Sequence, residues 1–249
     1  MKQFSKIVGT FLFAAFANTA LAGMIVVNHD EWTLSNTGFS QSSDAGIFAD
    51  NVAQFFTGGG VGNFHAYSTN FGLTQSSLTT ALGNAGHTYS TGTAPSFDVG
   101  SLLAFDAIFV AGPAAGLNAL TLVDYVNAGG NVYLAGGTGV FGSGAAEANF
   151  WNQFLNPFGM AFQTKFNGLG GNFDVSSAPH EIFNNVSTLF ENNGNTTLDL
   201  VVSDDANVYF NGRYAVYDNT GVTVPEPSII ALFAVGLFGL GFARRRMSS

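Results

Sequence analysis

Short apolar runs alternate with longer segments of helical spacing along most of the chain. The clearest unit joins an apolar run at 105–112 to a helical pattern at 117–128 and then to a second apolar run at 131–137. The run at 24–28 has the same character. Buried strands this short, separated by helices, are typical of a parallel sheet that helices cover on both faces. The pattern therefore predicts a doubly wound, mostly parallel α/β fold.

Further segments fit the same alternation. Residues 44–56 and 73–82 each place apolar side chains at helical spacing, and strands are expected at 63–68 and around 87–89. Aromatic residues also recur at steps of three or four, which indicates a core-facing helix that leads into a strand. This aromatic stripe consists of Phe150, Trp151, Phe154, Phe158 and Phe162.

The first 22 residues have the three parts of a secretory signal peptide. Lys2 and Lys6 form a basic start, an apolar centre follows at 7–16, and Ala20 and Ala22 supply a small-x-small cleavage site. The sequence therefore predicts export of the chain, with cleavage after Ala22.

The last segment of the chain is apolar and ends in a basic cluster. Residues 228–243 contain no charged side chain, and Arg244, Arg245 and Arg246 follow directly. A helix of this length measures about 24 Å, which is short for a bilayer core of about 30 Å. A buried helix of a soluble fold would carry polar residues at every third or fourth position, and none occurs here. We therefore expect a single transmembrane helix at 228–243, with the arginines on the cytoplasmic side.

A short motif, Pro225, Glu226 and Pro227, directly precedes this helix. The triplet, the apolar segment and the arginine cluster together resemble the tail of PEP-CTERM proteins of Gram-negative bacteria. The resemblance covers 222–249 and implies recognition of the triplet by an exosortase-type membrane protease, with the arginines at 244–246 as the cytoplasmic stop. It further implies delivery to the cell surface or to the exopolysaccharide matrix of a biofilm. Two prolines keep the triplet extended and accessible.

Residues 23–221, between the two apolar ends, are enough for one extracytoplasmic domain with a full core. Residues 23–224 carry fifteen acidic residues against two basic ones, Lys165 and Arg213. A domain of this charge lacks the cationic contacts that binding to nucleic acid or anionic lipid needs. The chain also has no cysteine, which excludes disulfides, thiolate metal sites and thiol catalysis.

The centre of the domain has a second resemblance. In the sequence LVDYVNAGGNVYLAGGTG, a helix of the pattern L..YV..GG leads into a strand and a tight turn. The segment 105–162 resembles the class I glutamine amidotransferase-like or ThuA-like fold, and the resemblance extends over about 24–190. In that superfamily the turn carries the nucleophile. Here the turn at 135–139 reads Ala-Gly-Gly-Thr-Gly, so the amidotransferase cysteine is absent.

Thr138 supplies the hydroxyl of this turn. Its use as a nucleophile requires an adjacent base, and none of the four histidines lies in a recognisable nucleophile-base signature. The glycines favour a tight strand-to-helix connection in which Thr138 or a neighbour caps the next helix. Phosphate binding here would be accompanied by a G-x-G-x-x-G pattern or a Walker lysine, and neither occurs. The sequence therefore predicts no catalytic residue, metal or cofactor.

A polar cluster reading NHDEW directly follows the first predicted strand. Doubly wound sheets bind ligands outside the carboxyl ends of their strands, so His29, Asp30 and Glu31 form a candidate ligand site. Thr138, which follows a later strand, is expected to join them. These groups could bind a metal or act as acid and base, with Trp32 as a sugar-stacking platform. A solvated polar loop at the start of the mature domain explains the same residues.

These features predict an exported cell-surface or exopolysaccharide-associated protein whose domain is a non-catalytic structural or binding module. An extracellular hydrolase acting on carbohydrate or peptide is the alternative, and a calcium-dependent matrix adhesin is the third. A convergent pocket with paired ionisable groups favours the hydrolase, whereas scattered, solvated side chains favour the display protein. The expected partners are an exosortase-type protease, exopolysaccharide and, through the C-terminal helix, the membrane, but no nucleic acid.

Overall fold

The computed structural model describes residues 22–94, 96–199 and 205–218. The elements in chain order are β1 (Ile25–Asn28), α1 (Asn36–Gln41), α2 (Ala45–Thr57), β2 (Asn63–Ala66), α3 (Phe71–Thr74), α4 (Ser76–Asn84), β3 (Thr88–Thr91), α5 (Val99–Leu102), β4 (Ala107–Ala111), α6 (Ala119–Asn127), β5 (Asn131–Ala135), α7 (Gly144–Leu155), the 3-10 helix η1 (Asn156–Phe158), β6 (Met160–Phe166), β7 (Gly170–Asp174), η2 (Glu181–Phe183), β8 (Thr188–Asn192), β9 (Asn195–Asp199), β10 (Ala206–Tyr209), η3 (Phe210–Gly212) and β11 (Tyr214–Tyr217).

Several predicted features lie outside the described residues. These are the signal peptide, apart from its last residue, Ala22, the sorting motif at 225–227, the C-terminal helix at 228–243 and the arginines at 244–246. Within the part of the chain that is described, no helix is both long and apolar enough to cross a membrane.

The main sheet has seven strands in the order β10-β11-β1-β5-β4-β2-β3. The strands β1, β5, β4, β2 and β3 pair in parallel, and β11 and β10 extend the sheet as antiparallel strands beside β1. Two small antiparallel pairs, β6 with β9 and β7 with β8, stand apart from it. The prediction of a mixed α/β domain with a mostly parallel sheet is confirmed.

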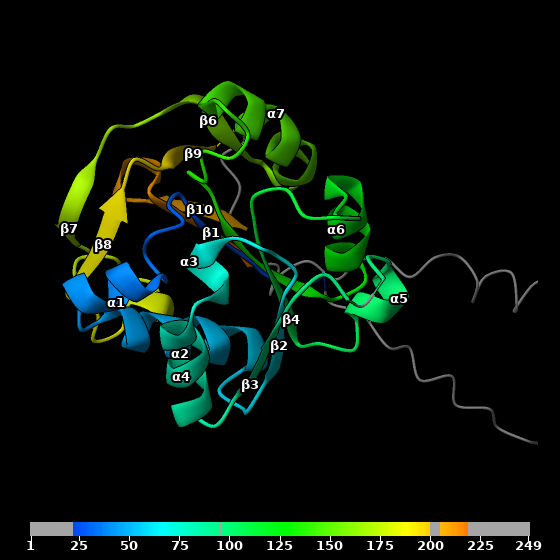
Figure 1. Cartoon of the computed structure of the whole chain (residues 1–249), viewed down its shortest axis with the longest axis horizontal. Helices are drawn as coiled ribbons and strands as arrows, with labels where there is room; N and C mark the ends of the chain where they lie inside the picture. Colours follow the sequence, from blue (N-terminus) through cyan, green and yellow to red (C-terminus); the bar gives the residue numbers. More distant parts are fainter. Residues whose placement is uncertain (1–21, 95, 200–204, 219–249) are drawn as a thin grey trace, which may run out of the picture. The chain divides into compact units, whose positions relative to one another are not determined.

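The parallel strands β1, β4 and β5 bury both of their faces, because neighbouring residues in a strand point to opposite sides and every residue of these strands is buried. Val26 lies in one core with Phe48 of α2 and Leu78 of α4. Val27 lies in the other core with Trp151 of α7. Helices α2 and α4 accordingly lie on one side of the sheet and α6 and α7 on the other (Figure 1).

The unit predicted from the strongest pattern is present as β4, α6 and β5. The helix α6 begins after Asn118, whose side chain accepts a hydrogen bond from the backbone N–H of Leu120. Gly129, with φ of 96°, follows the helix. A Cβ atom on Gly130 would lie 2.1 Å from the Tyr125 ring. Only glycine at this position therefore lets the chain pass so close to Tyr125 of the preceding helix.

The aromatic stripe also lies where the spacing places it. Four of its members are buried, and the fifth, Phe150, packs partly buried against the same core. The buried members are Trp151, Phe154, Phe158 and Phe162. The interpretation of this stripe as core is therefore confirmed.

The helix expected over 73–82 is interrupted. Gln75 separates α3 from α4 with an extended backbone (φ −80°, ψ 159°). Its side-chain oxygen accepts a hydrogen bond from the backbone N–H of Asn36, at 2.7 Å. The break in the helix thus coincides with a contact to the start of α1, which the spacing of apolar residues does not reveal.

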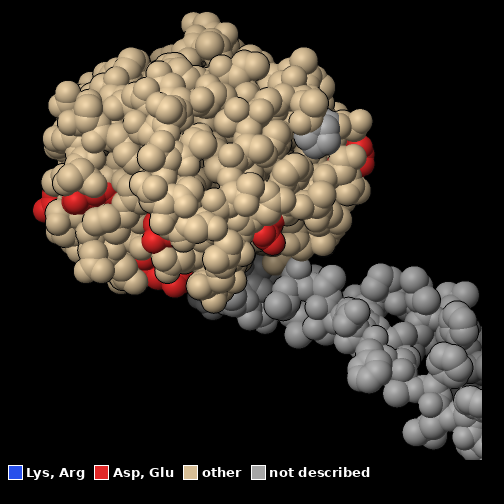
Figure 2. All heavy atoms as spheres, turned by 60° about the horizontal axis from the view of Figure 1, so that its bottom comes forward, with Lys and Arg blue, Asp and Glu red and all other residues tan. Residues whose placement is uncertain are grey.

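Charged side chains are sparse on the domain surface. Figure 2 shows one face on which acidic side chains are few and no lysine or arginine is visible. In the described part of the chain the basic residues are Lys165 and Arg213. The side chain of Arg213 is only 12% exposed, so the surface offers almost no positive charge.

Candidate functional site

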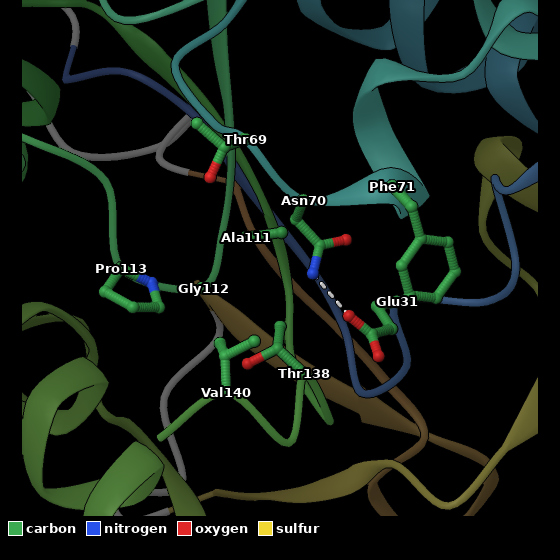
Figure 3. A pocket seen from close by; sticks show the side chains of 9 residues that line it. All are labelled: Glu31, Thr69, Asn70, Phe71, Ala111, Gly112, Pro113, Thr138 and Val140. Atoms are coloured by element: carbon green, nitrogen blue, oxygen red, sulfur yellow. Dashed lines mark hydrogen bonds between the residues drawn. The ribbon is translucent and has the colours of Figure 1, made fainter. Parts of the chain in front are cut away.

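A pocket of about 290 Å³ opens at the carboxyl edge of the parallel sheet (Figure 3). The segments that line it follow β1 and β2 and adjoin the ends of β4 and β5, which is where open α/β sheets bind their ligands. Its polar lining consists of Glu31, Thr69, Asn70 and Thr138, and its apolar surface comes mainly from Phe71, Pro113 and Val140.

Glu31 is the carboxyl group of this pocket. The residue is 7% exposed, and its Oε2 accepts a hydrogen bond from the amide of Asn70. Asn70 is fixed in turn because its Oδ1 caps α3, accepting from the backbone N–H of Gly72 at 2.8 Å. A Cβ atom on Gly72 would lie 2.1 Å from the Glu31 carbonyl oxygen, so glycine permits this approach. Burial raises the pKa of Glu31 to about 7, and the Asn70 hydrogen bond acts in the opposite direction.

Asp30 turns away from the pocket. Its Oδ1 accepts from the backbone N–H of Trp32 at 2.7 Å, and its Oδ2 accepts from the backbone N–H of Asn192. Burial raises the pKa of Asp30 to about 6, whereas the neighbouring His29 lowers it. Asp30 therefore ties the end of β1 to the end of β8 rather than facing a ligand.

His29 belongs to a buried ion network behind the pocket. Its Nε2 lies 3.0 Å from Oε2 of Glu191, and its Nδ1 lies 2.8 Å from the amide nitrogen of Asn167. Arg213 donates from one guanidinium nitrogen to both oxygens of Glu191, at 2.9 and 3.0 Å. The guanidinium also lies 4.9 Å from the centre of the Phe173 ring. The interpretation of NHDEW as a solvated loop is wrong, because His29 and Asp30 have no exposed surface.

Thr138 lines the pocket, but its hydroxyl is already bound. Both its Oγ1 and its backbone N–H donate to Oε1 of Glu147, at 2.8 and 3.1 Å, and the backbone N–H of Gly137 binds the same carboxylate. Asn195 donates to the other oxygen of Glu147 at 3.1 Å. Burial raises the pKa of Glu147, and the hydrogen bonds from Thr138 act against that rise. The anion-binding capacity of this turn is thus filled from within the domain.

The backbone of the turn does not present Thr138 as a nucleophile. A nucleophile elbow holds its reactive residue on a sharp, strained turn. Here the left-handed positions are Gly137 and Gly139, with φ of 69° and 66°, and Thr138 is not left-handed. The prediction that Thr138 or a close neighbour caps the next helix is wrong for Thr138, because α7 is capped by Ser143, which accepts from the N–H of Ala146.

The predicted ligand site is therefore divided by the structure. Glu31 and Thr138 line one pocket, whereas His29 and Asp30 lie in hydrogen-bond networks outside its lining. Two participants were not predicted, namely Asn70 and Glu147. Glu147 lies four residues before the buried Trp151, so a carboxylate on the apolar stripe of α7 was the available signal. Asn70 had no comparable signal beyond its position after a strand.

Candidate metal ligands do not gather in the described residues. No group of three or more histidine, aspartate or glutamate side chains there has the arrangement needed to hold a metal ion. The calcium-dependent adhesin accordingly stays an untested prediction.

The fold and the pocket define an α/β domain whose candidate ligand site lies at the carboxyl edge of its sheet. Residues 223–246 match the family model of the PEP-CTERM protein-sorting motif. This motif, which includes the predicted Pro225, Glu226 and Pro227, indicates an exported protein that is sorted by exosortase, a membrane protease. Comparison with curated proteins and with solved structures gives no match. The amidotransferase-like resemblance of the domain therefore stays a prediction.

Proposed function

We propose that the pocket of the described domain is a non-catalytic binding site and that the PEP-CTERM tail directs the domain to the cell surface or to an exopolysaccharide matrix. The observation that carries this proposal is the occupied turn after β5. Its backbone N–H groups bind the carboxylate of Glu147, so an oxyanion or a phosphate would first have to displace that group. Its hydroxyl donates to the same carboxylate, and its left-handed positions are glycines.

The pocket beside this turn supports binding of a small polar ligand. Glu31 uses one carboxyl oxygen for Asn70 and has a second one to offer, Thr69 adds a hydroxyl, and Phe71 adds an aromatic face. No basic side chain lines the pocket, and the buried acids nearby disfavour an anionic ligand. A volume of about 290 Å³ suits a neutral or cationic molecule the size of one sugar residue.

An extracellular hydrolase is the second candidate, because Glu31 has the pKa of about 7 that suits an acid or base at neutral pH. A glycosidase of the usual kind, however, uses two carboxyl groups around the scissile bond. Glu31 is the single carboxyl group among the residues that line the pocket. The geometry of the pocket therefore favours binding of a ligand over its hydrolysis.

The binding proposal is tested by thermal melting of the purified full-length protein with a panel of neutral sugars, amino sugars and sugar acids. We expect a neutral or amino sugar to raise the melting temperature in the wild type and to have a smaller effect in Glu31→Ala. The sugar acids should have no effect. Release of a cleaved sugar product would instead support the hydrolase, and the absence of any shift across the panel would contradict the binding module.

The sorting proposal is tested separately, in the native host with and without its exosortase. The C-terminus of the mature protein is followed by mass spectrometry in the membrane, surface and matrix fractions. We expect loss of the arginines at 244–246 only when the enzyme is present, together with delivery to the surface or matrix. Retention of these arginines on all mature protein would refute processing.

A further inference from the structure

A serine and a histidine face each other at the end of the sheet farthest from the ion network. His65 of β2 and Ser90 of β3 are direct partners in the parallel register. The side-chain oxygen of Ser90 lies 2.8 Å from Nδ1 of His65. The other ring nitrogen, Nε2, lies 3.1 Å from the carbonyl oxygen of Gly92. The contact joins two residues that are 25 positions apart, so no short sequence motif indicates it.

The hydrogen-bond partners fix which ring nitrogen carries the proton. A carbonyl oxygen can only accept, so Nε2 of His65 must donate to Gly92, and Nδ1 of the neutral ring is then an acceptor. The Ser90 hydroxyl donates to it, since the other acceptor within reach, the Phe64 carbonyl, is farther away at 3.4 Å. Burial lowers the pKa of His65, with the Gly92 contact acting in the opposite direction, so the ring is neutral at neutral pH.

The base is held rigidly while the hydroxyl stays accessible. His65 is 3% exposed, and its ring stacks on Phe105 with centroids 4.8 Å apart. The Tyr67 ring, the titratable side chain among the ring contacts of His65, lies 6.3 Å away. Ser90, in contrast, is exposed on β3, which is the last strand of the sheet. A nucleophile within hydrogen-bond reach of a base that a third group orients is the structural signature of an activated hydroxyl.

We propose that Ser90 is a nucleophile that accepts an acyl or phosphonyl group from an activated electrophile, with His65 as its general base and the Gly92 carbonyl as the group that orients the base. Oγ of Ser90 forms a bond to the carbonyl carbon of an ester while its proton passes to Nδ1 of His65. The bond from that carbon to the leaving oxygen then breaks, and the leaving alcohol takes up the proton. Water deprotonated by the same nitrogen releases the acid and restores the serine. This site is separate from the Glu31 pocket and does not depend on the proposed binding function.

The test uses the purified full-length protein and a fluorophosphonate probe, with peptide mass spectrometry to locate the label. Labelling forms the Oγ–P bond and releases fluoride and the serine proton. We expect the label on Ser90, its loss from that peptide in Ser90→Ala, and a rate lowered about 100-fold in His65→Gln. Ser101→Ala is the matched control, because Ser101 is a partly exposed serine whose hydroxyl donates to the Asp98 carboxylate at 2.9 Å. That variant should label as the wild type does.

A second readout requires no variant. The labelling rate of the wild type should rise with pH as His65 loses its proton, with a midpoint below the ordinary value of 6.5. A rate on Ser90 no greater than on Ser101, or one that does not change between about pH 4 and about pH 8, would overturn the proposal. So would unchanged labelling in a folded His65→Gln variant.

Discussion

Two buried carboxyl environments lie beyond the end of β1, and they differ in their counter-charges. Glu191 is fully buried and has both Arg213 and His29 within 3.0 Å. Glu31 is nearly as buried, but its partner is the neutral amide of Asn70. A paired buried charge holds elements together, whereas one without a counter-charge keeps its proton and stays available to a ligand. The difference separates a structural site from a candidate binding site, although His29 of the first and Glu31 of the second are only two residues apart.

The largest effect is expected from removing the counter-charge of Glu191. Arg213→Met should lower the free energy of unfolding by about 3–5 kcal/mol, because it leaves a buried carboxylate without its guanidinium partner. Denaturant unfolding of the mature protein measures this change in the free energy of unfolding. The control is Lys165→Met at an exposed position, which should change the value by less than about 0.5 kcal/mol. If the two variants unfold alike, the ion network is not structural.

A somewhat smaller loss is expected for Glu147→Ala. The substitution removes the acceptor of the Thr138 N–H and hydroxyl and of the Asn195 amide, and buried unsatisfied donors are costly. The free energy of unfolding should fall by about 3 kcal/mol, and Glu181→Ala, at an exposed acid, should leave it nearly unchanged. Equal stability of both variants would remove the basis for calling the turn occupied.

Glu31 should make stability depend on pH in a specific direction. The folded domain keeps the Glu31 proton up to about pH 7, whereas the unfolded chain releases it near the ordinary glutamate pKa of 4.5. The stability that this group contributes is therefore complete below 4.5 and is lost as the pH rises through about 7. Glu31→Gln should match the wild type at about pH 4 and exceed it by about 3 kcal/mol at about pH 8. Equal pH dependence in the two proteins would contradict the environment described for Glu31.

The smallest expected effect tests the contact between Asn70 and Glu31. Because the Asn70 hydrogen bond favours the ionised carboxylate, Asn70→Ala should move the pKa of Glu31 above 7, by up to about one unit. The Glu31 titration is followed by carboxyl-carbon NMR. Thr69→Ala, at a pocket residue that makes no described contact with Glu31, is the control and should leave the midpoint in place. A lower midpoint in the Asn70 variant would reverse the assigned role.

The sequence predicts local features of the domain better than its long-range pairings. The apolar runs at 105–112 and 131–137 are buried on both faces, so their period and length predict β4 and β5. The strand β11 could not be placed beside β1 in this way, because strand pairing between distant segments leaves no periodic signal. The same limit applies to the pairing of His65 with Ser90.

The sequence predicted where the candidate site lies, but not all of the residues that form it. Strand ends identified Glu31 and Thr138, because ligand sites of open α/β sheets lie there. The rule could not tell that the side chain of Asp30 turns to the backbone of Asn192 while the next residue faces the pocket. It also could not reveal that Glu147, nine positions after Thr138, fills the turn.

The candidate binding pocket depends on Glu31 being a buried carboxyl group without a counter-charge. The most direct measurement is an NMR titration of the Glu31 side-chain carboxyl carbon in the otherwise unmodified protein, assigned by comparison with Glu31→Gln. We predict a midpoint at about pH 7. A midpoint near 4.5, the ordinary pKa of a glutamate, would show a solvated or paired group and would contradict the pocket as described.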